Sequence, residues 1–206
     1  MFGPFGVPRG SDTWGLSRNA ADRHRRIWLA ITLCNLLIKS HRLPDFGAEA
    51  PQRCTVRLLA GRSATAELRA DTQPDHLITI EGIALPDDSF DRTIRNHGPE
   101  QVDDQRALAE VYRVALPWGV AILTSPVLEG RAQTDLTPDF NRKGDRLVHF
   151  GQAGHRWLFG RDLRDRIRAA GFALDEVPAV EPDVARYGLM RGEPVFIATK
   201  PTAGAQ

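Results

Sequence analysis

The 206-residue sequence is poor in cysteine, in net charge and in long apolar runs. Its two cysteines, Cys34 and Cys54, form no Cys-x-x-Cys pattern, which argues against a disulfide framework. The formal net charge is +1, from 27 basic and 26 acidic residues, and offers no general attraction for nucleic acid or for an anionic membrane. No apolar run approaches the ~20 residues of a membrane span, and no signal-peptide pattern is found. We therefore expect a cytoplasmic protein with no nucleic-acid partner and no membrane partner.

The motifs of several enzyme classes are also missing. The sequence has no Gly-x-Ser-x-Gly elbow, no phosphate-binding loop and no convincing constellation of metal ligands, so we predict no metal site. A hydrophobic content of 42% and a length of 206 residues suit one globular domain with a substantial core. We expect an N-terminal arm and helix in residues 1–40, packed on the core, and an α/β domain in residues 41–206.

The stretch from Asp87 to Pro126 predicts a strand, a helix and a second strand. Residues 90–96 have the length and apolar content of a short strand, which the sequence Asn96-His97-Gly98-Pro99 then breaks. Residues 120–123 form an unbroken apolar run, which predicts a strand buried on both faces. Two such strands joined by a helix form a right-handed crossover in a parallel sheet.

The helix between these strands is predicted over residues 102–116. Leu108, Val111 and Ala115 follow the i, i+3, i+7 spacing of one helical face. The sequence Pro117-Trp118-Gly119 is expected to stop the helix.

The polar break after the first of these strands is the best-placed stretch for chemistry, because ligands of open parallel sheets bind beyond the carboxyl ends of the strands. Asn96, His97 and Glu100 are therefore candidate site residues. On spacing alone, the alternative is a capped loop in which His97 and Glu100 only meet solvent, since one such unit serves many functions.

The same stretch resembles the S-adenosylmethionine-dependent methyltransferases with the Rossmann-like fold. The resemblance is to a bacterial small-molecule type whose signature runs PDDSFD, a hydrophobic pair, and then SHVLEHV-DD-A-E-RVL-PGG. PDDSFD is intact as Pro86 to Asp91. The further matches are His97, Glu100, Val102, Asp103, Asp104, Ala107, Glu110, Arg113, Val114, Pro117 and Gly119, and the departures are Arg95, Gly98, Pro99, Gln101 and Trp118.

This resemblance implies a Rossmann-like methyltransferase fold, with a mostly parallel sheet and an antiparallel C-terminal strand. It also implies S-adenosylmethionine as the cofactor. Asn96 and His97 would then flank the methionine and sulfonium part of the cofactor.

A second resemblance covers His149 to Val177, which is similar to the family's FGQEDHVRLYGRDFVDRLRAAGFEVE. The pattern predicts a helix that Gly171 ends. Residues 172–177 and 194–199 are predicted as strands, and the resemblance implies that they form a closing antiparallel pair. His155 follows a glycine-containing loop. It is either a base or proton relay in the substrate pocket, or a residue that holds the loop by a structural hydrogen bond.

The cofactor half of the family is matched poorly. Val56 to Leu59 is predicted as the first strand, after a polar connection in residues 40–53. Ala60 and Gly61 would form the cofactor-binding loop, because a glycine lets the backbone approach a ligand closely. The relatives carry a glutamate where this chain has Arg62.

The predicted elements after this loop are short. Ala64 to Ala70 predicts only a short helix, and Leu77 to Ile80 the next strand. Because a crossover alone takes at least ~10–12 residues, the 14 residues 63–76 are too few, and one strand is expected to be missing or badly reduced. Thr79 stands where the family has the aspartate that contacts adenine, and Glu81, two positions away, is a candidate substitute.

The N-terminal region predicts the strongest helix, over residues 20–39. Ile27, Ile31, Cys34 and Ile38 form one apolar line, so much of this helix is expected to be buried. In the family a cysteine pair precedes this helix; here its positions hold glycine and arginine, so that metal knuckle cannot form.

Two functions from different classes follow from these observations. The first is an S-adenosylmethionine-dependent methyltransferase acting on a small-molecule acceptor, with His97, Glu100 or His155 as the base. The second is a degenerate, non-catalytic relative that forms a homodimer or pairs with an active homologue, which Arg62, Thr79 and the reduced strand motivate. A third function, a cyclisation or hydrolysis on the same fold, is not selected by any residue.

Overall fold

The structure, a computed structural model, describes residues 25, 27, 43–46, 63–67, 76–77, 79–96, 103–135 and 159–202. Within this part of the chain, none of the helices combines the length and the apolar character needed to cross a membrane.

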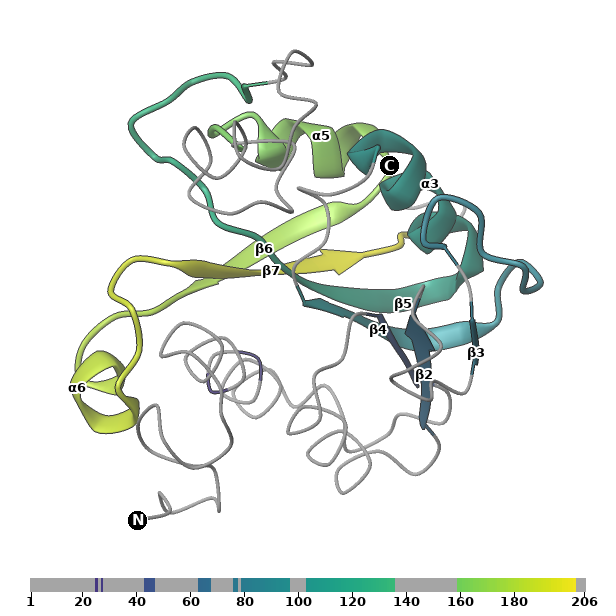
Figure 1. Cartoon of the computed structure of the whole chain (residues 1–206), viewed down its shortest axis with the longest axis horizontal. Coiled ribbons are helices and arrows are strands. Elements are labelled where there is room, and N and C mark those ends of the chain that lie inside the picture. The colour runs from purple at the N-terminus through teal and green to yellow at the C-terminus, as the bar shows by residue number, and fades with distance from the viewer. Residues whose placement is uncertain are drawn as a thin grey trace.

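The described strands form one seven-stranded sheet with the order β3-β2-β1-β4-β5-β7-β6 (Figure 1). The first five strands pair in parallel, while β7 runs antiparallel to β5 and to β6. This confirms the expected mostly parallel sheet with an antiparallel C-terminal strand. The strands are β1 (Leu43–Phe46), β2 (Ser63–Glu67), β3 (His76–Leu77), β4 (Phe90–Asn96), β5 (Ala115–Thr124), β6 (Ala173–Pro178) and β7 (Pro194–Thr199).

The central unit β4-α3-β5 has the predicted order. Helix α3 (Asp104–Val114) begins after Asp103, whose side chain accepts hydrogen bonds from the backbone N–H groups of Gln105 and Arg106. Such a cap satisfies donors that the first helical turn leaves without partners. The predicted apolar face is buried, as Leu108 and Val111 are at most 3% exposed.

Two layers of side chains cover the sheet. Helices α3 and α5 (Leu163–Ala169) lie over one face (Figure 1). On the opposite face, Ile27 of the N-terminal region packs with Ile94 of β4 and Ile122 of β5. Because neighbouring residues of a strand point to opposite faces, β5 contributes to both layers. The layer under α3 and α5 contains Leu108, Val111, Ala121, Leu123, Phe159, Leu163, Ile167, Phe172, Phe196 and Ala198.

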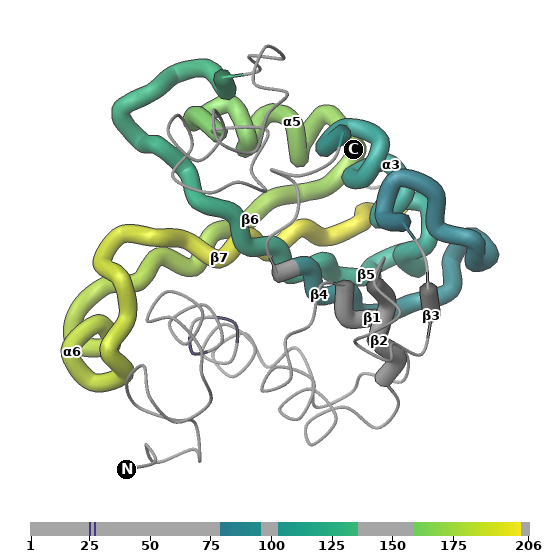
Figure 2. Tube along the Cα trace, viewed as in Figure 1, coloured from purple at the N-terminus to yellow at the C-terminus, as the bar shows by residue number. Residues whose placement is uncertain are grey.

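The C-terminal hairpin forms one end of the sheet. Strands β6 and β7 are joined by a segment that contains α6 (Asp183–Tyr187), which lies at the far end of the hairpin from α3 (Figure 2). Arg25 ties the N-terminal region to this segment, because its Nη2 donates to the Gly188 carbonyl at 2.8 Å. Strand β6 is the edge strand, and Asp175, Glu176 and Pro178 are exposed on it.

The first strand lies outside the segment predicted for it. Strand β1 falls within residues 40–53, which were expected to be a connection, and it occupies the place beside β4 that was assigned to Val56–Leu59. That assignment is wrong, and Val56–Leu59 itself lies outside the described residues. A four-residue strand containing Pro44 and Asp45 carries too weak an apolar signal to be recognised.

The second and third strands correct two further predictions. Residues 63–67 form β2, so the helix predicted from Ala64 to Ala70 is wrong. The alanines favoured a helix by intrinsic propensity, but pairing with β1 overrides that preference. Strand β3 contains only His76 and Leu77, and Ile80 lies in a turn. The strand expected to be missing or badly reduced between Arg62 and Leu77 is present as β2 with five residues, so that prediction is wrong. The strand predicted over Leu77 to Ile80 is the one that is reduced, to the two residues of β3.

Strand β5 begins at Ala115, five positions before the predicted start at Val120. Helix α3 already ends at Val114, so Pro117-Trp118-Gly119 does not stop it; these residues instead form an irregular start of β5, where the pairing with β4 shifts register. Trp118 has a positive φ of 62° and is 61% exposed, and its N–H donates to the Lys200 carbonyl at 2.8 Å. A tryptophan in this backbone conformation is strained.

Candidate functional site

The strand order of the sheet reverses between β1 and β4. From β1 the chain continues to β2 on one side, and from β4 it continues to β5 on the other. Phe46, the last residue of β1, pairs with Arg95, and Asp45 pairs with Ile94. In open α/β sheets a ligand crevice lies beyond the carboxyl ends of the strands at such a switch point. The carboxyl ends of β1 and β4 therefore mark the candidate site.

Strand β4 carries a predicted site residue to this edge. Asn96 is the last residue of β4 and pairs with Thr124 of β5. His97 and Glu100 follow it in the chain and lie outside the described residues, as do His155, Ala60 and Gly61. Asn96 ends β4 as predicted, and the role of the break that follows it stays a prediction.

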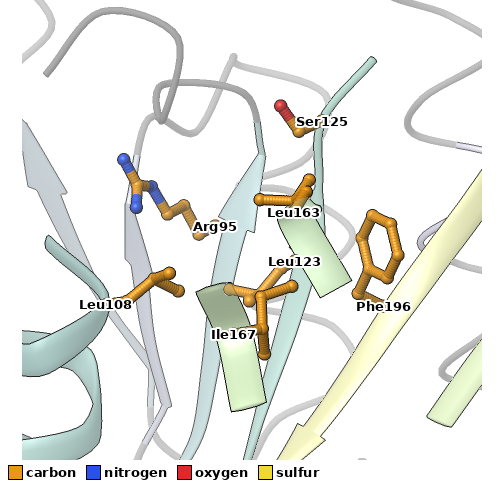
Figure 3. A pocket seen from close by; sticks show the side chains of 7 residues that line it. All are labelled: Arg95, Leu108, Leu123, Ser125, Leu163, Ile167 and Phe196. Carbon is orange, nitrogen blue, oxygen red and sulfur yellow. The ribbon is translucent and has the colours of Figure 1, made fainter. Parts of the chain in front are cut away.

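A buried cation lies next to Asn96. Arg95 is 1% exposed, and its side chain also interacts within the protein. It borders a pocket under α3 and α5 whose other walls are mainly apolar (Figure 3). The pocket encloses about 10 Å³, about enough for one water molecule, so it cannot hold an acceptor in this form. Its lining residues are Arg95, Leu108, Leu123, Ser125, Leu163, Ile167 and Phe196.

The start of α3 is fixed by two acidic side chains. Glu81 Oε1 accepts a hydrogen bond from the Asp103 backbone N–H at 2.5 Å. Asp104 is 2% exposed and accepts two hydrogen bonds from Arg166 of α5, from Nε at 2.6 Å and from Nη2 at 2.7 Å. This bidentate ion pair raises the pKa of the Arg166 guanidinium. Together these contacts hold α3 against both α5 and the loop after β3.

The loop between β3 and β4 contains two of the predicted cofactor residues. Thr79 Oγ1 accepts from the Glu81 N–H at 3.3 Å, and the Thr79 carbonyl accepts from the Gly82 N–H at 3.2 Å. Glu81 and Thr79 therefore lie in one turn, close to the start of α3. Both of these contacts of Thr79 are with backbone N–H groups of the turn, and its predicted role near adenine stays a prediction.

A cluster around Arg113 holds the rest of this loop on α3. Arg113 donates to the carbonyls of Ile83 and Leu85 and forms ion pairs with Asp87 and Glu110. Glu110 also accepts from the Ile83 N–H at 2.7 Å. The hydrogen bond from Arg113 holds the pKa of Glu110 below its ordinary value of 4.5. The loop beside the candidate site is therefore anchored along the length of the helix.

The segment after β5 closes over the start of α5. Thr134 Oγ1 donates to Asp162 at 2.6 Å and accepts from the Gly160 N–H at 3.3 Å. A side chain at Gly160 would lie 2.6 Å from the Gln133 backbone, so the two segments approach as closely as only a glycine allows. Leu128 N–H also donates to the Phe159 carbonyl.

The corrected strand order identifies positions that sequence reasoning missed. Glu67 is the last residue of β2, so the chain reaches it at the same edge as Phe46 and Asn96. Gly47 follows β1 directly in the sequence, and Glu67 comes 20 residues after it. A glycine after the first strand with an acidic residue about 20 positions on is the spacing of a nucleotide-binding crossover. That spacing was the signal available in the sequence.

The same correction removes the reason for choosing Ala60 and Gly61. They were selected because they would follow the first strand. In the structure they precede Ser63, the first residue of β2, and β2 runs parallel to β1. Ala60 and Gly61 lie outside the described residues, so their predicted role stays a prediction.

No protein-family model matches the sequence, and no curated protein matches it. Solved structures do match. The chain is similar to the 1,6-didemethyltoxoflavin-N1-methyltransferase of Burkholderia thailandensis, crystallised with 1,6-didemethyltoxoflavin and S-adenosylhomocysteine. Here the TM-score is 0.61 and the identity 16%, over 93% of this chain and 82% of that chain.

Two further structures show the same similarity. One is a methyltransferase dependent on S-adenosylmethionine from Archaeoglobus fulgidus, with a TM-score of 0.61 and 14% identity over 92% of this chain and 97% of that chain. The other is a complex of the Haloferax volcanii Trm112 methyltransferase activator with a proposed methyltransferase, with a TM-score of 0.58 and 15% identity over 97% of this chain and 100% of that chain. At these identities the similarity concerns the fold alone: the chain has the Rossmann-like fold of the S-adenosylmethionine-dependent methyltransferases.

Proposed function

We propose that this protein is an S-adenosylmethionine-dependent methyltransferase that acts on a small-molecule acceptor. The observation that carries the proposal is the switch point between β1 and β4, with the carboxyl ends of β1, β2 and β4 at one edge of the sheet. Glu67 ends β2 and Asn96 ends β4 at this edge, and in the sequence a glycine follows β1 directly. We expect these residue types to suit a nucleoside with an amino-acid tail.

Each part of the cofactor has a candidate residue. Gly47 takes the place first given to Ala60 and Gly61, since it follows β1 and lets the backbone approach closely. Glu67 would accept hydrogen bonds from the ribose hydroxyls. The turn that contains Thr79 and Glu81 lies on the adenine side, next to β3.

The remaining candidate residues belong to the reacting end of the site, where the methyl group would pass from the cofactor to the acceptor. Asn96 and His97 would flank the methionine and sulfonium region. When bound, the cofactor supplies an activated methyl group for direct displacement by the acceptor, so the protein mainly has to position the two reactants. His97, Glu100 or His155 would take the proton that the acceptor loses.

The first test is calorimetric titration of the purified chain with S-adenosylhomocysteine. We expect binding in the micromolar range, about −8 kcal/mol. Glu67→Ala should weaken this binding by about tenfold, since a charge-assisted pair of hydrogen bonds is lost. Asp175→Ala is the matched control, because Asp175 is an exposed acid on β6 at the other end of the sheet. Equal affinity of the wild type and Glu67→Ala would contradict the role of Glu67.

A second test concerns the reacting end. His97→Ala should lower methyl transfer without lowering the melting temperature. Unchanged turnover would remove His97 from the mechanism and leave Glu100 and His155 as candidates. The acceptor can be sought among small aromatic and aliphatic nucleophiles with wild-type protein and radiolabelled cofactor.

A non-catalytic partner subunit is the second candidate function. The observation that favours it is the shortness of the first three strands, with four, five and two residues, which build the cofactor half of this fold. A protein of this kind would show no heat with S-adenosylhomocysteine and no thermal stabilisation at high ligand concentration. It would instead associate with itself or with an active homologue in sedimentation experiments.

A further inference from the structure

The cap of α3 is completed by a residue from outside the helix. In a capping box, the third residue of the helix accepts a hydrogen bond from the backbone N–H of the cap residue. Here the cap is Asp103 and the third helical residue is Arg106, whose side chain has no acceptor. Glu81, 22 positions earlier, takes this role and accepts from the Asp103 N–H.

The turn that carries Glu81 is itself held in place. Thr79 fixes the Glu81 N–H, and Glu110 fixes the Ile83 N–H. Ile83 is 2% exposed and packs against Val114 near the end of α3. Glu81 therefore reaches the start of α3 from a turn that is anchored farther along the same helix.

This contact fixes one end of the connection between β4 and α3. Six residues, 97–102, separate Asn96 from Asp103. Asn96 is held by its pairing with β5, and Asp103 by Glu81 and by its own capping bonds. Fixing both ends of a short connection lowers the conformational entropy that ligand binding must remove.

We propose that Glu81 is a positioning residue, which sets the reacting end of the site through the Asp103 backbone rather than by contact with adenine. The inference rests on the proposed function, because the connection it positions contains His97 and Glu100. Its consequence is that the adenine side and the methionine side of the site are coupled through one carboxylate. Loss of that carboxylate should affect the methionine side more than the adenosine side.

The test compares two ligands that differ in the amino-acid part. S-adenosylhomocysteine has this part, and 5′-methylthioadenosine keeps the adenosine and the sulfur without it. For Glu81→Ala we expect affinity for S-adenosylhomocysteine to fall by about tenfold and affinity for 5′-methylthioadenosine to change by less than about twofold. Glu81→Gln keeps a carbonyl acceptor and should recover most of the loss.

A matched control separates positioning from simple stabilisation. Asp103→Ala removes the side-chain cap of the same helix. It keeps the backbone N–H at position 103, which donates to Glu81. It should lower the melting temperature to a similar extent, with a smaller loss of S-adenosylhomocysteine affinity. Should Glu81→Ala fail to fold, Glu81→Asp gives the same comparison, because it keeps the charge but is shorter by one methylene.

Each of the following results would overturn the proposal. An equal loss for both ligands would mean that Glu81 contacts the adenosine part directly. A lower melting temperature with both affinities unchanged would mean that the contact is only structural. Absence of S-adenosylhomocysteine binding by the wild type would overturn the proposed function, and this inference with it, whereas wild-type binding with unaffected variants would overturn this inference alone.

Discussion

The two halves of the sheet are built differently. Strands β4, β5 and β7 contain seven, ten and six residues, and their central side chains are almost completely buried between two layers. Strands β1, β2 and β3 contain four, five and two residues. The half with β4, β5 and β7 thus has long strands with buried side chains. The half with β1, β2 and β3, which is expected to hold the cofactor, has short strands. The long strands therefore supply most of the described core, and the two halves meet at the candidate site between β1 and β4.

The largest effect on the free energy of unfolding is expected from breaking the ion pair between Asp104 and Arg166, which joins α3 to α5. Arg166→Met should lower the free energy of unfolding by about 3–5 kcal/mol, because it leaves the Asp104 carboxylate buried without its cation. Arg168→Met on the same helix is the control, since Arg168 pairs with Asp165, which is 82% exposed. Urea unfolding would show the difference. Similar losses for both variants would mean that Asp104 finds another partner or reaches water.

The two halves should also differ in amide hydrogen exchange. We expect the amides of Ile122 and Ile197 to exchange at least about 100-fold more slowly than those of Thr65 and Ala66, because the former lie in long strands with buried neighbours. Addition of S-adenosylhomocysteine should slow Thr65 and Ala66 more than Ile122. Uniform protection across the sheet without ligand would contradict the comparison.

A smaller effect is expected from Glu110, which anchors the loop before β4. Its pKa is lowered in the folded protein, so its contribution to stability is present above its ordinary value of 4.5 and is lost as the pH falls through the folded value. Glu110→Gln should therefore cost about 1 kcal/mol at pH 7. The difference between the wild type and this variant should shrink as the pH is lowered below 4.5. A difference that stays constant down to pH 2 would assign the effect to the hydrogen bond alone.

The smallest expected effect is a gain in stability, from replacing a buried threonine. Thr93 of β4 is 1% exposed, and its hydroxyl has no hydrogen-bond partner in the part of the chain that the structure describes. Thr93→Val keeps the shape and should stabilise the protein by about 1 kcal/mol. Thr124→Val on the neighbouring strand is the matched control: Thr124 is equally buried but makes an interaction, so this variant should be destabilised. A loss of stability in Thr93→Val would indicate a buried water on that hydroxyl.

The contrast between the halves also explains what could be predicted from the sequence. The unit β4-α3-β5 was predicted because a helical apolar face and an unbroken apolar run stand between breaks that contain glycine and proline. The strands β6 and β7 were predicted from the sequence, and their antiparallel pairing was implied by the family resemblance. Strand β1 was missed because Pro44 and Asp45 interrupt its apolar pattern. Its pairing with β4 depends on residues about 50 positions away, which local periodicity does not contain.

The candidate site shows the same division. The end of β4 at Asn96 was predicted correctly, because Gly98 and Pro99 break the strand pattern soon after it, while the role of Asn96 at the site stays a prediction. The contact between Glu81 and Asp103 spans 22 positions, so no local pattern predicts it. Arg106 at the third position of α3 was an indirect signal, since it leaves the cap residue's N–H without the usual acceptor from within the helix. Glu67 was missed because the strand that ends with it was predicted as a helix.

The edge strand β6 has a consequence for the way copies of this protein can join. The exposed carboxylate of Asp175 and the ring of Pro178 oppose the addition of another strand at this end of the sheet. Among the described strands, the other end of the sheet is β3, which has two residues. An open fibre of sheets needs strand addition at both ends, so a β6 end that opposes addition disfavours such a fibre.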